Sequence, residues 1–425
     1  MRSNKSFSAA KSIFVIFVTL LLASVVVPAQ TQAAKFKVLH TFHGKDGAIP
    51  FGLLVRDGAG NLYGTTADGG SGSGLCISFV QGCGTAFKLN QFGEELWVHS
   101  FNFTNGAEPL AGMVRDRAGD LYGTTVSGGN TKCYQYGCGT LFKLDAGGKE
   151  KVLHEFRGSD GEFPEALLTR DAAGNLYGTT YLTPGNIFKV DPAGKLTVLY
   201  TFTGYADGCN PSPGVIVDAA GNLYGVATSG GSAYCGYGDG VIFELGTANN
   251  LTVLHTFAGA DGSQPDSVLL FDKSGNLYGT TYSGGTSDVC EAGCGAVFKL
   301  APNANGTWTE SVLHSFCSEE GCADGWYAGR GPLAMDATGN LYGTTEEGGT
   351  NGCGGYGCGV VYKLDPSGQE TVLYKFMGGK DGVGPEQGVV IDKGGNLYGV
   401  AGNGGDSSCP VNGAHGCGVV FKLTP

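Results

Sequence analysis

Basic residues are scarce in this sequence, and they form no cluster. The chain has 26 lysine and arginine residues against 38 aspartate and glutamate residues, which gives a formal net charge of −12. A protein that binds nucleic acid or an anionic membrane needs positive charge to neutralise phosphate groups. The composition therefore argues against both of these partners and leaves neutral glycans, cations and other proteins.

Helical periodicity and long apolar runs are also missing beyond the N-terminus. Residues 13–27 are almost wholly apolar, follow three basic residues and precede a run of small residues. This order is typical of a secretory signal peptide, so we expect residues 1–34 to be one, cleaved between Ala29 and Ala34. A retained anchor is the alternative, but the run is short for a membrane span. We therefore expect a secreted or periplasmic protein with no membrane span in the mature chain.

What the chain has in abundance is a repeat. Each copy of an Asn-Leu-Tyr-Gly motif is followed by a Phe-Lys-Leu-like segment and then by a Val-Leu-His-Thr-Phe-like segment. Glycine-punctuated units of this length, rich in strand-forming residues, are typical of β-propeller blades. In the fifth unit we expect strands at 267–272, 276–281, 295–300 and 311–316. The seven variants of the motif begin at residues 61, 120, 175, 222, 276, 340 and 396.

The two ends of the repeat region predict how the ring closes. Residues 38–42 spell Val-Leu-His-Thr-Phe with no blade before them, and residues 420–423 spell Val-Phe-Lys-Leu with no fourth strand after them. The first strand would then complete the last blade and hide sheet edges that would otherwise be exposed. The sequence thus predicts an all-β, seven-bladed β-propeller over residues 35–425, closed by its N-terminal strand (Velcro closure). We expect this single domain to be a monomer.

These motifs resemble those of the GloVer tandem-repeat proteins, a family of exported bacterial proteins. The resemblance covers about residues 36–425 and rests on Gly-Asn-Leu-Tyr-Gly-Thr-Thr, Gly-Cys-Gly-Thr-x-Phe-Lys-Leu and Val-Leu-His-Thr-Phe. It implies a secreted or surface location and implies no activity. The family is also named for interchangeable C-terminal anchors, whereas here Pro425 directly follows the last strand-like segment.

All fourteen cysteines are expected to form disulfides, because an even number in an exported chain favours pairing. Zinc sites are the alternative, but histidines near the cysteines are mostly lacking. Six pairs are close in sequence, and the two remaining cysteines would pair across one blade. The predicted pairs are Cys76–Cys83, Cys133–Cys138, Cys209–Cys235, Cys290–Cys294, Cys317–Cys322, Cys353–Cys358 and Cys409–Cys417.

Histidine and serine motifs of common enzymes are absent. The chain has no Gly-x-Ser-x-Gly elbow, His-Glu-x-x-His motif or aspartate-rich calcium loop. Only His43 and His415 lie outside the repeat, and we weigh an acid–base or metal pair against plain exposed positions. The sequence therefore predicts no catalytic residue, no metal site and no cofactor. The other five histidines share one repeated position, which favours a structural role: His40, His99, His154, His255 and His314.

Aspartates recur at two positions of the repeat. Those of an Asp-Gly-x-x-Pro motif would bind a cation if they ringed the channel, but an Asp-Gly turn is the favoured interpretation. Those that precede the Asn-Leu-Tyr-Gly motif, such as Asp57 and Asp392, are expected to form Asx-type turns. The first group comprises Asp46, Asp160, Asp261 and Asp381, with looser versions at Asp207 and Asp324.

Aromatic residues are concentrated in the long loops. The loops after the second and fourth strands are expected on one face of the disc, where variable loops on a fixed scaffold usually carry function. Flat rings on such loops suit stacking on sugar rings, and packing of the loops on one another is the alternative. The predicted ligand-binding residues are Tyr134, Tyr136, Tyr237, Trp326, Tyr327 and Tyr356.

Together these observations favour an exported binding protein that holds a polysaccharide or a protein on its long-loop face. The alternative is an extracellular lyase or hydrolase that acts on polymer at the channel mouth. Carboxyl groups that converge in one pocket would favour the enzyme. The sequence does not decide between them, because propellers support many unrelated functions. The candidate loop acids are Asp239, Asp288, Glu291, Glu319, Glu346 and Glu347.

Overall fold

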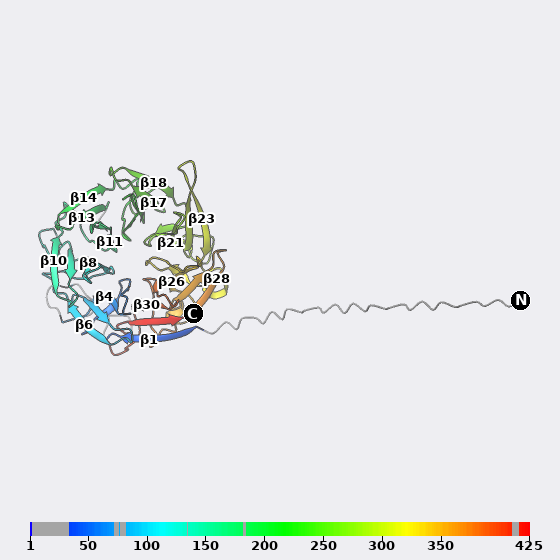
Figure 1. The fold of residues 1–425 in the computed structure, drawn as a ribbon, viewed down its shortest axis with the longest axis horizontal. Helices are drawn as coiled ribbons and strands as arrows, with labels where there is room; N and C mark the ends of the chain where they lie inside the picture. The colour runs from blue at the N-terminus through cyan, green and yellow to red at the C-terminus, as the bar shows by residue number, and fades with distance from the viewer. Residues whose placement is uncertain (2–33, 72–75, 77–81, 134, 182–183, 410–415) are drawn as a thin grey trace. The chain divides into compact units, whose positions relative to one another are not determined.

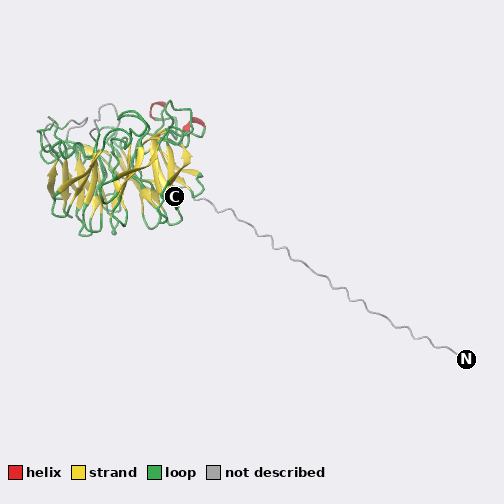
Figure 2. Cartoon of the chain, turned by 90° about the horizontal axis from the view of Figure 1, so that it is seen from above, coloured by secondary structure: helices red, strands yellow, loops and turns green. Residues whose placement is uncertain are grey.

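Seven antiparallel sheets make up residues 34–425 in the computed structural model and are arranged around a centre (Figure 1). Loops connect the strands at the two faces of the disc, and two 3-10 helices, η1 (Glu320–Cys322) and η2 (Cys353–Gly355), lie at one face (Figure 2). The structure describes residues 1, 34–71, 76, 82–133, 135–181, 184–409 and 416–425. The predicted all-β, seven-bladed propeller is confirmed.

Each sheet is one blade, with its strands in order from the centre to the rim. Blade 1 contains β2 (Ala48–Pro50), β3 (Val55–Arg56), β4 (Leu62–Asp68), β5 (Thr85–Leu89) and β6 (Glu95–Ser100). Blade 2 contains β7 (Val114–Arg115), β8 (Leu121–Thr125), β9 (Thr140–Leu144) and β10 (Glu150–Glu155). Blade 3 contains β11 (Thr169–Arg170), β12 (Leu176–Thr180), β13 (Asn186–Val190) and β14 (Leu196–Thr201).

The remaining blades follow the same plan. Blade 4 contains β15 (Val215–Val217), β16 (Leu223–Ala227), β17 (Val241–Leu245) and β18 (Leu251–Thr256). Blade 5 contains β19 (Ser263–Pro265), β20 (Leu270–Phe271), β21 (Leu277–Ser283), β22 (Ala296–Pro302) and β23 (Trp308–Ser315). Blade 6 contains β24 (Trp326–Ala328), β25 (Ala334–Met335), β26 (Leu341–Glu347), β27 (Val360–Leu364) and β28 (Glu370–Lys375). Blade 7 contains β29 (Val389–Ile391), β30 (Leu397–Ala401), β31 (Val419–Thr424) and β1 (Lys35–Thr41).

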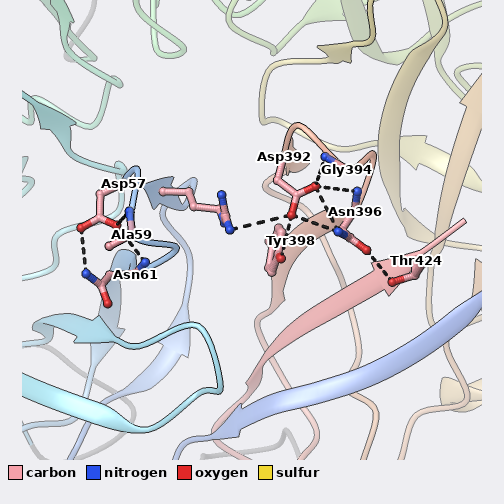
Figure 3. A network of polar contacts seen from close by, with 9 residues as sticks. Asp57, Ala59, Asn61, Asp392, Gly394, Asn396, Tyr398 and Thr424 are labelled. Atoms are coloured by element: carbon pink, nitrogen blue, oxygen red, sulfur yellow. Dashed lines mark hydrogen bonds and ion pairs between the residues drawn. The ribbon is translucent and has the colours of Figure 1, made fainter.

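The polar residues of the repeat motif build the turn between the first and second strands. Asp57 accepts hydrogen bonds from the backbone N–H groups of Ala59 and Asn61, each at 2.9 Å, and from Tyr63 Oη at 3.0 Å. Asp392 makes the equivalent bonds in blade 7 (Figure 3). A carboxylate that accepts backbone N–H groups in this way fixes an Asx-type turn. The turn prediction for these aspartates is confirmed.

The glycine of the motif is required by the aromatic residue opposite it. Gly123 of β8 pairs with Phe142 of β9, and a Cβ at Gly123 would lie 2.6 Å from Phe142 Cζ. The same relation holds between Gly279 and Phe298 in blade 5, also at 2.6 Å. The phenylalanine ring therefore lies across the glycine, and a side chain there would collide with a fully buried ring.

The first strand of a blade differs from its sequence prediction. In blade 5 a continuous strand was expected over 267–272, but the structure has two pieces, β19 and β20, separated by residues 266–269. A left-handed residue recurs just before the repeated proline, or before Ala328 in blade 6. Its φ lies between 54° and 59° at Ile49, Glu108, Phe163, Asn210, Gln264 and Tyr327. In blade 5 this residue lies inside β19, where Ser263 pairs with Ser283 and Pro265 with Thr281, and the strand ends at the proline.

The N-terminal strand closes the ring. β1 pairs antiparallel with β31, with Phe36 opposite Leu423 and Val38 opposite Phe421 (Figure 1). The Phe36 ring also stacks on Tyr374 of blade 6, with 3.9 Å between the ring centroids. The predicted closure is confirmed, and the outermost strand of blade 7 thereby contacts the neighbouring blade.

All seven predicted disulfides are present, from Cys76–Cys83 to Cys409–Cys417. The backbone carbonyl of the second cysteine in a loop often supports the next blade. Cys294 O accepts the N–H of Tyr327 at 2.9 Å, and Cys83 O accepts the N–H of Glu108 at 3.0 Å. The disulfides therefore stiffen loops that hold the left-handed residues near the centre. Over the described residues, no helix has the length and apolar character needed to cross a membrane.

Candidate binding site at the centre of the propeller

Inner segments from all seven blades line a cavity of about 110 Å³ at the centre of the ring. Threonines of the second strands hold several of these segments against the preceding blade. Thr65 Oγ1 donates a hydrogen bond to Ala111 O at 2.8 Å, and Thr280 Oγ1 donates to Gly329 O at 3.1 Å. The cavity wall is therefore fixed by bonds between blades.

One side of this wall is apolar and the other is polar. Phe51 and Leu110 contribute apolar surface from blades 1 and 2, whereas blades 3 to 6 contribute Glu165, Ser212, Asp266 and Arg330. Arg330 Nε lies 3.4 Å from Asp266 Oδ2, and Ser212 Oγ donates to Asp266 Oδ1 at 3.2 Å. The Arg330 side chain is 47% exposed, and its guanidinium also lies over the Phe51 ring, 5.9 Å from the centroid. Arg330 therefore has donors left for a ligand.

Burial and like charge raise the pKa values of the carboxyl groups around Arg330. Burial and then Asp266 raise the pKa of Glu165 to about 7. Burial and then Glu346 raise the pKa of Glu386 to about 8. Burial also raises the pKa of Asp266, against the opposing effect of Arg330. We call Glu165, Asp266, Arg330, Glu346 and Glu386 the channel cluster.

The channel cluster has more acid than it can neutralise internally. Burial would lower the pKa of Arg330, but the negative charges of Asp266 and Glu386 outweigh it, and the pKa is raised. Four carboxyl groups therefore share one guanidinium. Protons, water molecules or hydroxyl groups of a ligand can satisfy the remaining carboxyl oxygens.

Aromatic rings adjoin this cluster in blades 5 and 6. Tyr282, in β21, stacks on Tyr327 of β24 with 4.4 Å between centroids and 10° between the planes. Trp326 makes edge contacts with Tyr327 at 5.2 Å and with Tyr356 at 6.0 Å. Burial and then the charge of Glu346 raise the pKa of Tyr282. The platform adjoins the channel cluster through β24, because Trp326 pairs with Glu347 and Ala328 with Thr345 on either side of Glu346. We call Tyr282, Trp326, Tyr327 and Tyr356 the aromatic platform.

The structure thus brings together three of the six predicted ligand-binding residues: Trp326, Tyr327 and Tyr356. Tyr136 and Tyr237 are exposed on loops of blades 2 and 4, and Tyr134 lies outside the described residues. The six residues remain predictions as ligand contacts. The sequence does not predict that three of them form a platform, because it does not show that Trp326 and Tyr327 of blade 6 contact Tyr356 and Tyr282.

The predicted loop acids divide between the cavity and the rest of the molecule. Glu346 belongs to the channel cluster, and burial followed by Glu346 raises the pKa of Glu347. Glu319 lies in the loop after β23, where its backbone N–H donates to Asp324. Asp288 and Glu319 line a separate surface pocket near η1.

The remaining histidines and aspartates hold the repeat together. His40 Nε2 lies 3.0 Å from Asp46 Oδ2, and Tyr200 Oη donates to Asp207 Oδ2 at 2.9 Å. The aspartates of the Asp-Gly-x-x-Pro motif thus contact the fourth strands, away from the cavity. His43 Nδ1 lies 2.7 Å from Asp406 Oδ2, and its predicted partner His415 lies outside the described residues.

Sequence analysis missed Glu165, Asp266, Arg330 and Glu386. A signal was present, because Glu165, Asp266 and Glu386 each follow the repeated proline directly and Arg330 follows the corresponding position of blade 6. The equivalent residues of blades 1 and 2 are the apolar Phe51 and Leu110. The residue after the proline is thus charged in some blades and apolar in others. Once the interruption of the first strand was known, this difference would have identified the charged residues as candidates for the site.

The fold and cavity define a seven-bladed β-propeller with an acidic centre. The chain belongs to the Gloeobacter/Verrucomicrobia repeat family, whose profile matches residues 24–186 and 182–411. This confirms the resemblance seen in the repeat motifs. No curated protein matches the chain.

Several solved propeller enzymes are similar to the chain at 14% sequence identity. A gluconolactonase from Xanthomonas campestris has a TM-score of 0.40, with 67% of this chain and 78% of that chain covered. A putative gluconolactonase has a TM-score of 0.39, with 67% and 80% covered, and a luciferin-regenerating enzyme has 0.43, with 74% and 90% covered. Scores this low carry no argument about activity.

Proposed function

We propose that this protein binds a saccharide, and that the channel cluster and the aromatic platform together form the site. The observation that carries the proposal is their adjacency in blades 5 to 7. Tyr327, stacked on Tyr282, lies on β24, which pairs with β26, the strand that carries Glu346, and Arg330 follows β24 closely in the chain, so flat apolar surface meets a dense set of hydrogen-bonding groups. Binding sites for small molecules combine these two kinds of surface.

A saccharide fits this chemistry better than an anion or a metal ion. Its hydroxyl groups donate to carboxylates and accept from a guanidinium, and its apolar C–H faces pack on aromatic rings. The excess of carboxyl groups over Arg330 opposes anionic ligands. Among the described residues, the groups of three metal-binding side chains with donor atoms within 4.8 Å include none from the channel cluster.

The proposed location is an oxidising compartment, extracellular or periplasmic. Seven disulfides and no free cysteine among the described residues support it, because such bonds persist mainly in exported proteins. The signal peptide expected at residues 1–34 is part of the same proposal.

The lyase or hydrolase is not favoured. Raised pKa values of Glu165 and Glu386 follow from burial among like charges, and a cavity that only binds its ligand produces them equally. The similarities to solved enzymes are too weak to support a catalytic activity.

Glycan-array screening of the labelled protein, followed by calorimetric titration of the tightest oligosaccharide, tests the proposal. We expect Trp326→Ala and Arg330→Gln each to weaken binding about tenfold or more, which corresponds to about 1.4 kcal/mol. Arg330→Gln removes a charged donor, and Trp326→Ala removes a ring that also packs against the core cluster containing Phe316.

Matched controls are Tyr136→Ala and Tyr237→Ala, which remove exposed loop rings far from blade 6 in sequence. Both should bind like wild type. The proposal would be contradicted if Trp326→Ala and Arg330→Gln bound the saccharide as tightly as wild type. It would also be contradicted if the protein bound a protein partner and no saccharide. Thermal melting of each variant separates loss of the site from loss of the fold.

A further inference from the structure

The outermost strands of consecutive blades meet at interfaces that we call seams. At six seams a histidine or tyrosine of the fourth strand contacts the aspartate that starts the next blade, whereas at the seam of blades 1 and 2 His99 contacts Glu150. In blade 4, for example, His255 Nε2 lies 2.9 Å from Asp261 Oδ2, and Asp261 Oδ1 accepts the N–H of Ala258 at 2.8 Å. This pair is a recurring structural feature and requires no ligand.

A third residue reaches this pair from the fourth strand of the next blade. It is the residue that pairs with the last core position of the third strand, as Glu310 pairs with Leu300 and Glu370 pairs with Leu364. Blades 3 and 4 have Leu196 and Leu251 at this register position. At two seams, therefore, a second carboxyl group enters a site that already holds a histidine and an aspartate.

At these two seams the donor atoms converge, as in His255, Asp261 and Glu310, and again in His314, Asp324 and Glu370. In each set one ligand atom per side chain lies within 4.8 Å of the others. His314 Nε2 lies 3.5 Å from Asp324 Oδ2, and the Asp324 side chain is fully buried. The buried atoms His314 Nε2, Glu310 Oε1 and Glu370 Oε1 have no hydrogen-bond partner.

The seam between blades 1 and 2 provides an internal comparison. There Glu150 lies 2.9 Å from His99, but the residue at the aspartate position is Asn105, whose Nδ2 donates to Glu150 Oε2. The amide reaches one oxygen of the glutamate, while Glu150 Oε1 and His99 Nε2 have no hydrogen-bond partner. At the other two seams an acceptor-only carboxylate replaces this amide, which places two carboxyl groups beside the histidine with no amide donor between them.

We propose that the His255–Asp261–Glu310 and His314–Asp324–Glu370 seams are two binding sites for a divalent transition-metal ion such as Zn²⁺. Each ion would join consecutive blades at the rim, because the histidine belongs to one blade and the glutamate to the next. These sites are separate from the channel cluster and do not depend on the proposed saccharide.

The donor set selects the kind of metal. One imidazole nitrogen and two carboxylate oxygens suit Zn²⁺ and related ions, whereas Ca²⁺ and Mg²⁺ prefer oxygen ligands alone. Zinc bonds of about 2.0–2.1 Å place donor atoms roughly 3.3 Å apart, close to the histidine–aspartate separations already present.

Zinc stoichiometry of the untagged, disulfide-intact protein tests the proposal. After dialysis against a chelator and then against buffered Zn²⁺, we expect two zinc ions per chain by elemental analysis. Glu310→Gln and Glu370→Gln should each remove one ion, since a neutral amide is a poor zinc ligand. Zinc should also raise the melting temperature of wild type more than that of either variant.

Two further variants control for adventitious binding. His154→Gln alters a seam where His154 lies 2.8 Å from Asp160 but Leu196 occupies the third position, so two ions should remain. Asn105→Asp should complete a third set with His99 and Glu150 and raise the stoichiometry to three. Fewer than one ion in wild type, or the same stoichiometry in wild type, Glu310→Gln and Glu370→Gln, would overturn the proposal, as would no third ion in Asn105→Asp.

Discussion

At the scale of single residues, carboxyl groups occupy two contrasting environments in this propeller. Burial would raise the pKa of Asp57, but hydrogen bonds from Asn61 and Tyr63 outweigh it and hold the pKa below its ordinary value. Such aspartates stabilise the fold above pH 4 and lose this contribution as the pH falls through their lowered pKa. The glutamates of the cavity and seams behave in the opposite way, because few donors compensate their burial.

Glu370 gives a testable pH dependence. Its pKa is about 4.5 when unfolded and about 8 in the folded protein, so its contribution to stability is complete below pH 4.5 and is lost as the pH rises through 8. Glu370→Gln keeps the neutral form at all pH values. In chelator, we expect this variant to equal wild type at pH 4.5 and to be more stable at pH 9, by on the order of 2 kcal/mol.

Denaturant unfolding at the two pH values measures this difference. Glu95→Gln serves as the control, because Glu95 occupies the corresponding register position of β6 but its side chain is exposed. A wild-type protein that gains stability relative to Glu370→Gln between pH 5 and 9 would contradict the assignment of a buried, protonated Glu370.

At the scale of strands, each residue of the repeat motif has a defined role in the turn or in the packing of its blade. Its asparagine and tyrosine hydrogen-bond to the turn aspartate, its leucine is buried, and its glycine leaves room for the aromatic ring of the third strand. These hydrogen bonds and the glycine contact lie within one blade, so they could be interpreted from sequence without knowledge of the ring. The Tyr63 ring also packs against Met113 and Leu121 of the next blade.

Gly123→Ala tests the packing role of the glycine. The new methyl group would lie 2.6 Å from Phe142 Cζ and 3.2 Å from Met113 Cγ, so the ring or the strands must shift. Overpacking of this kind costs about 1–3 kcal/mol of stability. A guanidinium unfolding curve should show this loss through a lower midpoint.

Gly58→Ala is the matched control, because a Cβ there meets no atom within 4 Å and Gly58 is not left-handed. It should change the stability by less than about 0.5 kcal/mol. Equal effects of the two substitutions would show that backbone entropy, and not contact with Phe142, explains the glycine.

Strand position was less predictable where the cause was a single backbone angle. Sequence alternation predicted the second, third and fourth strands of blade 5 within a few residues, but the first strand is interrupted after Pro265, next to the left-handed Gln264. A glutamine carries no signal of left-handed backbone. The recurrence of the angle is visible only when the seven blades are superposed in space.

At the scale of the whole molecule, ring closure completes the central cavity. The pairing of β1 with β31 brings blade 7 against blade 1, and it places Gln387 of blade 7 in the same cavity as Glu165 of blade 3. The two ends of the repeat predicted this closure, because each end carried half of one blade. Residues of distant blades that meet at the centre were not predicted, since no local pattern connects them.

The difference between local patterns and contacts among distant residues also explains why the seam sites were not predicted. The repeated position of the histidines predicts a structural role, and no metal site is expected from the sequence, because histidines near the cysteines are mostly lacking and no aspartate-rich calcium loop is present. Glu310 and Glu370 approach His255 and His314 only through the stacking of consecutive blades. The proposed metal sites therefore depend on contacts between repeats, which the sequence of a single repeat does not show.

The most direct test of the central claim is a crystal structure of the protein with the tightest-binding oligosaccharide from the array. Our account expects a sugar ring against Tyr327 and Trp326, with hydroxyl groups within hydrogen-bonding distance of Arg330 and Glu346. A sugar bound instead at the exposed tyrosines of blades 2 and 4, with the central cavity holding only water, would contradict it.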